Sequence, residues 1–331
     1  MTRAWKETLG TLTLGTLLFA VAACSDASGG GDLFDPASGT GGTAGSGGSA
    51  TGGSGAFTSV LDGGGDDTGG GTDNGCADET KFVYVIDSDN RMFKFDPTIP
   101  SGAAFSLIGN MGCQGGDGPN SMSVGRDGYA YVLYGAQDVW TGGYTCAGVM
   151  KVDIKTAQCA GPSSFKCGSS GYQKFGMGFA TDTAGTSSEA LYLSNSLAPG
   201  LGRVDFTTGD VTHVGGLPGA AEFTGNANGE LWGFFPDVQP PAVLQVDKAS
   251  GAILKSYDLS GLPPLGFGGY AYAFAYWGGS FYIFYQVDDY DVSTNVWKLD
   301  MNGSLSKYIP NTGMRIVGAG VSTCAPVEPP K

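Results

Sequence analysis

The chain is poor in histidine and in basic side chains. Its 331 residues include one histidine, and 17 Lys and Arg residues stand against 31 Asp and Glu, for a formal net charge of −14. A single histidine excludes a metal site built from several imidazoles. The acidic balance argues against binding to nucleic acid, whose phosphates are recognised through Lys and Arg, and against simple adsorption to anionic lipid headgroups.

The apolar run at the start of the chain, from about Leu9 to Val21, is too short for a membrane-spanning helix. A spanning helix needs about 20 apolar residues. The run follows Arg3 and Lys6, and small residues then lead to Cys24. A short basic region followed by a short apolar one is typical of a secretory signal. Residues 1–23 are therefore predicted to be a signal peptide.

The end of this segment, Val21-Ala22-Ala23-Cys24, resembles the lipobox of bacterial lipoproteins. The resemblance implies cleavage after Ala23, thioether lipidation of Cys24 and acylation (palmitate) of the new amino terminus. An ordinary secretory signal with an incidental cysteine is the alternative. Ser25, in place of the aspartate of the enteric retention rule, favours the outer membrane. The predicted location is extracytoplasmic, with a lipid anchor in the bacterial cell envelope.

Residues 24–75, after the lipidated cysteine, have very few large apolar side chains. Gly, Ser, Thr, Ala and Asp dominate the segment. Such a sequence cannot bury enough apolar surface to offset the entropy lost on ordering, so we expect a disordered tether. A flexible chain of this length reaches about 40 Å. Residues 326–331 are likewise expected to be a disordered tail.

Residues 76–325 are rich in Tyr, Phe, Val and Gly, without a helical period, and one phrase recurs in them. The phrase is apolar-x-apolar-Asp, followed by a short turn and another apolar strand. Its aspartates lie between 42 and 57 residues apart. Its five copies are Phe93-Lys94-Phe95-Asp96, Met150-Lys151-Val152-Asp153, Gly202-Arg203-Val204-Asp205, Leu244-Gln245-Val246-Asp247 and Trp297-Lys298-Leu299-Asp300. Repeats of about 40–50 residues with several strands each indicate propeller blades.

The repeat domain resembles five-bladed β-propellers, and more loosely the secreted bacterial propeller repeats with a Leu/Val-Asp-x-x-Thr-Gly turn. The first unit starts at a second strand, Lys81 to Ile86, and lacks an inner one. The segment from Ile316 to Thr323 reads as an inner strand without a blade after it, so we expect it to complete the first blade. A sandwich, a β-helix, or six or seven blades remain as alternatives.

Seven cysteines minus the lipidated Cys24 leave an even number, as expected in an oxidising compartment. The predicted ring closure brings Cys76 and Cys324 to the same turn, so we expect a disulfide there. In blade two the layout favours Cys146 with Cys167, which leaves Cys113 with Cys159. The connectivity of these four cysteines stays open. Zinc binding is disfavoured because no paired C-x-x-C spacing occurs.

Catalytic candidates are few. His213 falls in an outer strand, away from the centre where a Ser-His-Asp triad would need it. Cleavage of a glycosidic bond needs two carboxyl groups, and the five expected inner strands offer only Glu222. Glu222 is therefore the candidate residue of an axial pocket, more plausible as a lining residue than as an acid catalyst. We expect no catalytic centre, and enzymatic activity is left open.

Two acidic loops join the second and third strands of their blades. One is Asp87-Ser88-Asp89-Asn90, and the other contains Asp288, Asp289 and Asp291. Oxygen ligands at alternate positions suit Ca²⁺, which makes Asp87 and Asp89 weak candidates. Neither loop matches an EF-hand, which also needs its glycine and a distal glutamate. No other cofactor is expected.

A recognition surface is predicted on the longest loops of the same face. The loop from Gly135 to Thr145 carries Asp138, Trp140 and Tyr144, and the loop from Gln286 to Asn295 carries the second acidic group. Aromatic residues on loops above a rigid scaffold are typical of binding surfaces. The predicted function is a lipid-anchored binding or scaffold module for a protein or glycan partner. A polysaccharide-active enzyme using the axial pocket and a purely structural envelope lipoprotein are the alternatives.

Overall fold

The computed structural model describes residues 75–329, apart from 114–117, 138–142, 199, 267, 288–289 and 291–292. The predicted signal peptide, Cys24 and almost all of the tether lie outside the described residues. The fold described below belongs to the unit formed by residues 68–331. Within the described ranges, no helix is long and apolar enough to cross a membrane.

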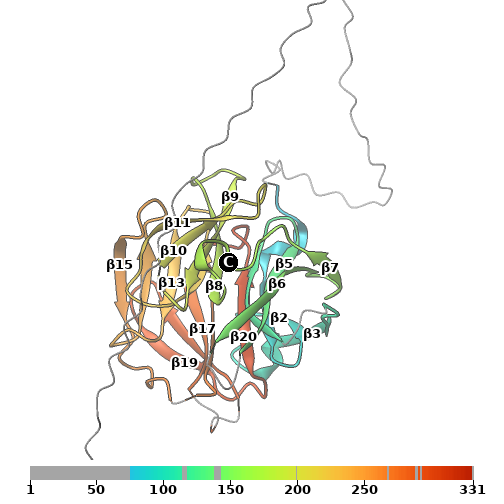
Figure 1. Cartoon of the computed structure of the whole chain (residues 1–331). Coiled ribbons are helices and arrows are strands. Elements are labelled where there is room, and N and C mark those ends of the chain that lie inside the picture. The colour runs from blue at the N-terminus through green and yellow to red at the C-terminus, as the bar shows by residue number, and fades with distance from the viewer. Residues whose placement is uncertain are drawn as a thin grey trace, which may run out of the picture. The chain divides into compact units, whose positions relative to one another are not determined.

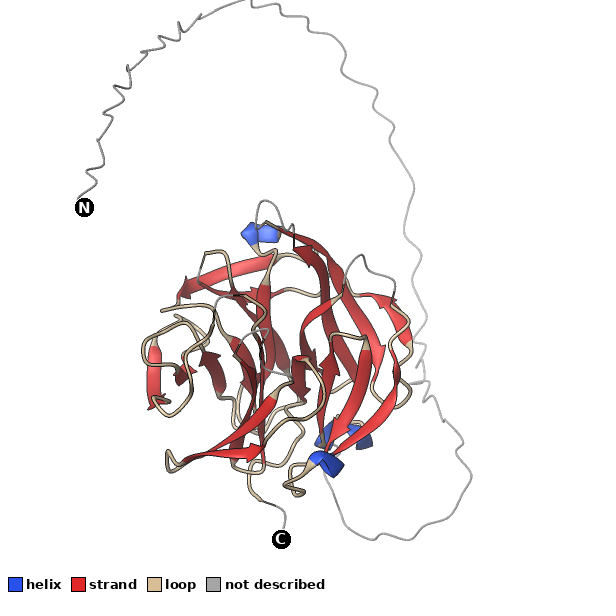
Figure 2. Ribbon diagram, turned by 90° about the horizontal axis from the view of Figure 1, so that it is seen from below, coloured by secondary structure: helices blue, strands red, loops and turns tan. Residues whose placement is uncertain are grey.

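The domain consists of β-strands with three short 3-10 helices, η1 (Asp78–Lys81), η2 (Gly102–Ala104) and η3 (Ser169–Gly171) (Figure 2). The strands form five antiparallel four-stranded sheets, which we number as blades one to five. From the inner to the outer strand, the blades are β20 (Ile316–Val321), β1 (Val83–Asp87), β2 (Arg91–Phe95), β3 (Phe105–Asn110); β4 (Pro119–Val124), β5 (Tyr129–Gln137), β6 (Tyr144–Asp153), β7 (Cys159–Pro162); β8 (Phe175–Thr181), β9 (Glu189–Asn195), β10 (Gly200–Val204), β11 (Val211–Gly216); β12 (Glu222–Gly225), β13 (Leu231–Phe235), β14 (Ala242–Val246), β15 (Ile253–Asp258); and β16 (Ala271–Trp277), β17 (Ser280–Gln286), β18 (Asn295–Asp300), β19 (Leu305–Ile309).

The inner strands form a closed ring. Strand β20 contacts β4, β4 contacts β8, β8 contacts β12, β12 contacts β16, and β16 contacts β20 again. The chain is thus a five-bladed β-propeller, as predicted, and the sandwich, the β-helix and the larger propellers are excluded. Between the blades lie apolar clusters rich in aromatic side chains, such as the one around Trp232, Phe274 and Phe281.

The ring closes through the C-terminal strand, as the sequence predicted. Strand β20, red in Figure 1, pairs antiparallel with β1, and Val83 lies opposite Val321. The Cys76–Cys324 disulfide joins the segments that flank this pair, with a Cα–Cα distance of 5.9 Å. Ordered contacts continue past the predicted domain boundary at residue 325, because the Pro326 and Val327 carbonyls accept hydrogen bonds from blade five.

The other two disulfides lie in and around blade two. Cys113 is bonded to Cys159 and Cys146 to Cys167, with Cα–Cα distances of 5.1 and 5.6 Å. These are the pairs that the blade layout favoured. All six cysteines of the propeller are therefore used in disulfides.

The inner strands approach one another so closely that several positions accept only glycine. A Cβ built on Gly176 would lie 2.0 Å from the Ala221 carbonyl oxygen, and one on Gly225 would lie 2.3 Å from the Phe179 carbonyl oxygen. Hydroxyl groups on these strands then reach backbone N–H groups of the next blade. Phe179 N, for example, donates to Ser123 Oγ at 2.9 Å. Side chains thus provide the hydrogen bonds between blades that sheet pairing provides within them.

The repeated aspartates are turn-forming residues. Asp205 Oδ1 accepts the backbone N–H groups of Thr207 and Thr208, at 2.8 and 3.4 Å. Asp247 Oδ1 similarly accepts from Ala249 N at 3.1 Å. The N–H donors lower the pKa of Asp205, because they stabilise its ionised form. In these two copies the aspartate of the repeated phrase therefore shapes the turn that follows it.

Candidate functional site

All five inner strands run in the same direction, so they begin on one face of the ring. That face, called the entry face below, consists of the first residues of the inner strands, the loops between blades and the loops joining the second and third strands of each blade. Of the predicted loop residues, Asp138, Trp140, Asp288, Asp289 and Asp291 lie outside the described residues. The binding role assigned to them stays a prediction.

Tyr144, predicted to lie on a recognition loop, is buried, which agrees with the alternative that it packs against the propeller. Its side chain is 7% exposed at the start of β6. Its ring lies 5.5 Å from Lys174 Nζ, in the segment that enters blade three. Gly135 lies opposite the ring, where a Cβ would be 2.5 Å from the Tyr144 hydroxyl oxygen. The ring is therefore held between blades two and three.

Glu222, the predicted axial residue, begins the inner strand of blade four and is buried. Ser121 Oγ of blade two donates a 2.7 Å hydrogen bond to Glu222 Oε2, and the Met177 backbone N–H of blade three also bonds to the carboxyl group. Burial raises the pKa of Glu222 well above its usual value, although both hydrogen bonds oppose the shift. The carboxyl group thus links three blades and is occupied by protein donors.

No second acid accompanies Glu222 on the inner strands. All five strands are described, and Glu222 is their only Asp or Glu. Asp182, just beyond β8, accepts a hydrogen bond from Ser188 Oγ and lies 3.6 Å from Arg203 of the same blade. The residues described therefore give no pair of carboxyl groups for glycoside cleavage in the ring.

A second group of polar and aromatic residues on the entry face was not singled out from the sequence. Tyr270 precedes β16 and Tyr272 lies on it, with ring centroids 6.2 Å apart and ring planes 12° from parallel. Tyr270 is 40% exposed, whereas Tyr272 is half-buried with its ring edge-on to Phe234. Asp237 lies on the loop that joins β13 and β14 of blade four, and its charge adds to the raised pKa of both tyrosines, of which burial is the main cause.

The polar atoms of this group have no protein partners. In the described part of the chain, the carboxylate of Asp237 and the hydroxyls of Tyr270 and Tyr272 form no hydrogen bond or ion pair. Partial burial raises the pKa of Asp237, because the carboxylate loses water without gaining a donor. We call Asp237, Tyr270 and Tyr272 the tyrosine–aspartate site. The sequence around Asp237 offers only a proline-rich stretch, Pro236 to Pro241, which marks a loop.

Arg315 fixes the backbone at this site. Its guanidinium donates to the Gly269 carbonyl and, at 3.0 Å, to the Tyr270 carbonyl. Gly268 and Gly269 both have positive φ, of 80° and 59°, in the segment that brings Tyr270 to the inner strand. The exposed ring is thus held by a hydrogen-bonded backbone.

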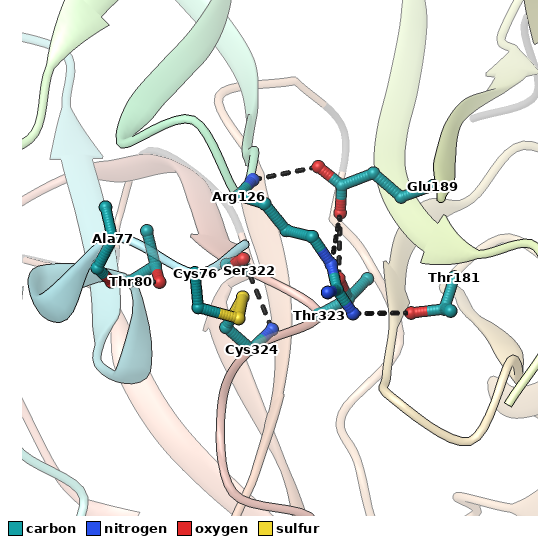
Figure 3. The surroundings of a disulfide bond; sticks show 9 residues. All are labelled: Cys76, Ala77, Thr80, Arg126, Thr181, Glu189, Ser322, Thr323 and Cys324. Atoms are coloured by element: carbon teal, nitrogen blue, oxygen red, sulfur yellow. Dashed lines mark hydrogen bonds and ion pairs between the residues drawn. A yellow bond between two sulfur atoms is a disulfide. The ribbon is translucent and has the colours of Figure 1, made fainter. Parts of the chain in front are cut away.

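The opposite face is closed by a charged network next to the Cys76–Cys324 disulfide (Figure 3). Arg126 is 8% exposed, and its Nε lies 2.7 Å from Thr323 Oγ1 and 3.7 Å from Glu189 Oε2. Glu189 also accepts hydrogen bonds from Arg126 N and Thr323 Oγ1, at 2.8 Å each. Burial nevertheless raises the pKa of Glu189. The network joins blades one, two and three.

Asp87 and Asp89, the weak calcium candidates, both form ion pairs with Arg91. Asp87 Oδ2 lies 2.5 Å from an Arg91 guanidinium nitrogen, and Asp87 Oδ1 accepts the Arg91 and Asp89 backbone N–H groups. Asp89 pairs with the same guanidinium at 3.1 Å. Where the chain is described, no group of three His, Cys, Asp or Glu side chains could hold a metal ion. His213 lies on the outer strand β11, with Nδ1 3.4 Å from the Tyr172 hydroxyl.

Comparison with known proteins assigns the chain neither a family nor an activity. No family model matches the chain, and no curated protein matches it. A nidogen/laminin complex contains a similar structure, with 8% identity, a TM-score of 0.43, and coverage of 72% of this chain and 97% of the other. A protein of unknown function from Bacteroides caccae has 12% identity and a TM-score of 0.41, covering 73% and 98%. A gluconolactonase from Xanthomonas campestris has 15% identity and a TM-score of 0.39, covering 65% and 70%.

Proposed function

We propose that this propeller is an extracytoplasmic binding module, held in the bacterial cell envelope by a lipid on Cys24. The observation that carries the binding role is the tyrosine–aspartate site. Its polar groups lack protein partners, whereas the one acid of the inner strands, Glu222, is buried and hydrogen-bonded. Aromatic rings with a few unpaired polar groups on a rigid scaffold are typical of ligand sites.

The cysteines support the location. All six cysteines of the propeller form disulfides, which are typical of oxidising compartments outside the cytoplasm. Cys24 is the one cysteine left for lipidation. The lipobox resemblance supplies the chemistry of the anchor, and Ser25 favours the outer membrane.

The anchor is tested by expressing the full chain and its Cys24→Ser variant in a Gram-negative host supplied with an alkyne-bearing palmitate analogue. The parent should carry the label and sediment with the outer membrane. The variant should carry no label and leave the membrane fraction. Equal labelling and sedimentation of the two proteins would overturn the anchor.

The binding role is tested by applying the mature parent chain to arrays of neutral and anionic glycans and of envelope proteins. The proposal predicts saturable binding to at least one class of probe, weakened by Asp237→Asn. Trp140→Ala, on the undescribed loop, tests the surface predicted from the sequence. Absence of saturable binding to every class would overturn the binding role and favour a structural one.

A further inference from the structure

We infer that the tyrosine–aspartate site binds a neutral glycan, with a sugar ring stacked on Tyr270 and its hydroxyls hydrogen-bonded to Asp237 and Tyr272. This inference rests on the proposed binding role and names the class of ligand. Nothing else in the described structure combines an exposed, fixed aromatic ring with a carboxylate that has no protein donor.

The aromatic half of the site is preorganised. Tyr270 immediately precedes β16 and Tyr272 is its second residue, and their stacked rings lie on the same side of the chain. Their rings are nearly parallel, and Phe234 supports Tyr272 edge-on with centroids 6.0 Å apart. Arg315 holds the Tyr270 backbone from blade one. A flat ring held in this way offers a large contact area at a small cost in side-chain entropy.

The polar half of the site suits hydroxyl groups. A carboxylate is an acceptor only, and the Asp237 carboxylate receives no donor from the described protein. Adjacent hydroxyls of a sugar can donate to its two oxygens and replace the water that partial burial removes. The pKa values of Tyr270 and Tyr272 are raised, by burial first and then by neighbouring carboxyl groups, so both hydroxyls stay protonated and can donate to a sugar oxygen.

The charge around the site favours a neutral ligand over an anionic one. Burial raises the pKa of Tyr270 and Tyr272, and the Asp237 carboxylate adds to both shifts, so the one negative charge assigned to the site is that of Asp237. Arg315, which reaches the site from blade one, donates hydrogen bonds to the Gly269 and Tyr270 carbonyl groups. An acidic sugar would meet repulsion without an available basic partner. The overall charge of −14 acts in the same direction.

The test uses the mature lipidated chain in detergent and isothermal titration calorimetry. The neutral probes are hexasaccharides of glucose, mannose, galactose, xylose and N-acetylglucosamine. Hexagalacturonic acid and tetramethylammonium serve as the anionic and cationic probes. We expect at least one neutral hexasaccharide to bind, with no measurable binding of the charged probes.

Variants assign the binding to the site. Tyr270→Ala should weaken the binding of the neutral sugar by about tenfold or more, as for a hot-spot aromatic residue. Tyr270→Phe keeps the ring and should stay within about threefold of the parent, since it loses at most one hydrogen bond. Asp237→Asn should weaken binding, whereas the matched Asp258→Asn, on the outer strand of the same blade, should not.

The pH dependence of the sugar affinity distinguishes loss of the Asp237 carboxylate from misfolding of a variant. Parent affinity should fall as pH falls through the raised pKa of Asp237, because a protonated carboxyl group loses acceptor capacity. The Asp237→Asn variant should lack this step. Unfolding midpoints equal to the parent's establish that the variants are folded.

The outcomes separate this inference from the proposed function. Tight binding of a protein or of a charged probe, with no neutral sugar bound, overturns the glycan inference and leaves the binding role standing. Neutral-sugar binding that is equal in the parent and Tyr270→Ala overturns the site. Failure of every probe class in both the titrations and the arrays overturns both.

Discussion

Ser121 Oγ donates a 2.7 Å hydrogen bond to Glu222 Oε2, and so connects blades two and four, which are not neighbours in the ring. The Met177 N–H of the blade between them bonds to the same carboxyl group. Glu222 therefore links three inner strands at a point where no sheet hydrogen bonds connect them. The carboxyl group is buried, and its burial makes the stability of the domain depend on pH.

Glu222 should make the domain less stable as pH rises. Its pKa in the folded protein lies well above 4.5, the ordinary value expected after unfolding. Between these two values the folded state holds a proton that the unfolded state releases, so the free energy of unfolding falls with rising pH, by at most about 1.4 kcal/mol per pH unit. Glu222→Gln keeps an acceptor for Ser121 and cannot ionise.

Urea unfolding of parent and Glu222→Gln at a series of pH values above 4.5 measures this effect. The variant should gain stability relative to the parent as pH rises. A difference between the two proteins that stays constant with pH would contradict the burial of Glu222 as a protonated group. The comparison of the variant with the parent removes contributions from other carboxyl groups, such as Glu189.

Arg126 and Glu189 should be strongly coupled. The side chains are 9% and 13% exposed, so removing one leaves the other buried without its charge partner. Loss of one member of a buried pair costs about 3–5 kcal/mol, whereas replacing both costs much less. Arg126→Met should therefore lower the free energy of unfolding more than the double variant Arg126→Met, Glu189→Gln. Chemical unfolding of the parent, Arg126→Met, Glu189→Gln and the double variant measures the coupling, and a double-variant loss equal to the sum of the two single losses would exclude it.

The sequence was sufficient for the ring and insufficient for the site, for physical reasons. The repeated turn aspartates mark the end of each third strand, so strand order and the missing inner strand of blade one could be read from the spacing of Asp96, Asp153 and their equivalents. Ring closure then placed Cys76 beside Cys324. These features depend on local turn chemistry and on counting strands.

The tyrosine–aspartate site depends on two irregular loops of neighbouring blades, whose paths no local pattern determines. Asp237 and Tyr270 lie 33 residues apart, and neither belongs to the repeated phrase. The burial of Tyr144 likewise depends on Lys174 of the next blade. The pairing of Asp87 with Arg91, by contrast, was accessible from the sequence, because the two residues are four positions apart across a tight turn.

The closing disulfide should stabilise the domain more than the local ones. Cys76–Cys324 spans 248 residues and Cys146–Cys167 spans 21. The chain-entropy model gives an upper value of about 5 kcal/mol for the long loop and about 3 kcal/mol for the short one. Replacing each pair by serines and measuring urea unfolding compares them. A larger loss from the Cys146–Cys167 pair would show that the Arg126 network closes the ring without help from the disulfide.

The packing of the inner strands predicts that an added methyl group will destabilise the domain at Gly176 but not at Gly216. In Gly176→Ala the new Cβ would lie 2.0 Å from the Ala221 carbonyl oxygen, which belongs to the backbone of the next blade. The strands would have to separate, and overpacking of a well-packed core costs about 1–3 kcal/mol or more. Gly216→Ala is the matched control, because its Cβ would have no atom within 4 Å and its φ is not positive.

Gly176→Ala should therefore lower the unfolding midpoint clearly, whereas Gly216→Ala should leave it unchanged or raise it slightly by restricting the unfolded chain. Thermal unfolding followed by circular dichroism measures both. Because Gly176 lies beside Glu222 in the ring, separation of these strands should also weaken the hydrogen bond from Met177. Since this bond opposes the raised pKa of Glu222, the pH dependence assigned to Glu222 should extend to higher pH. A Gly176→Ala protein with the parent's unfolding midpoint and pH profile would contradict the prediction. It would show that the inner strands can accommodate the added methyl group.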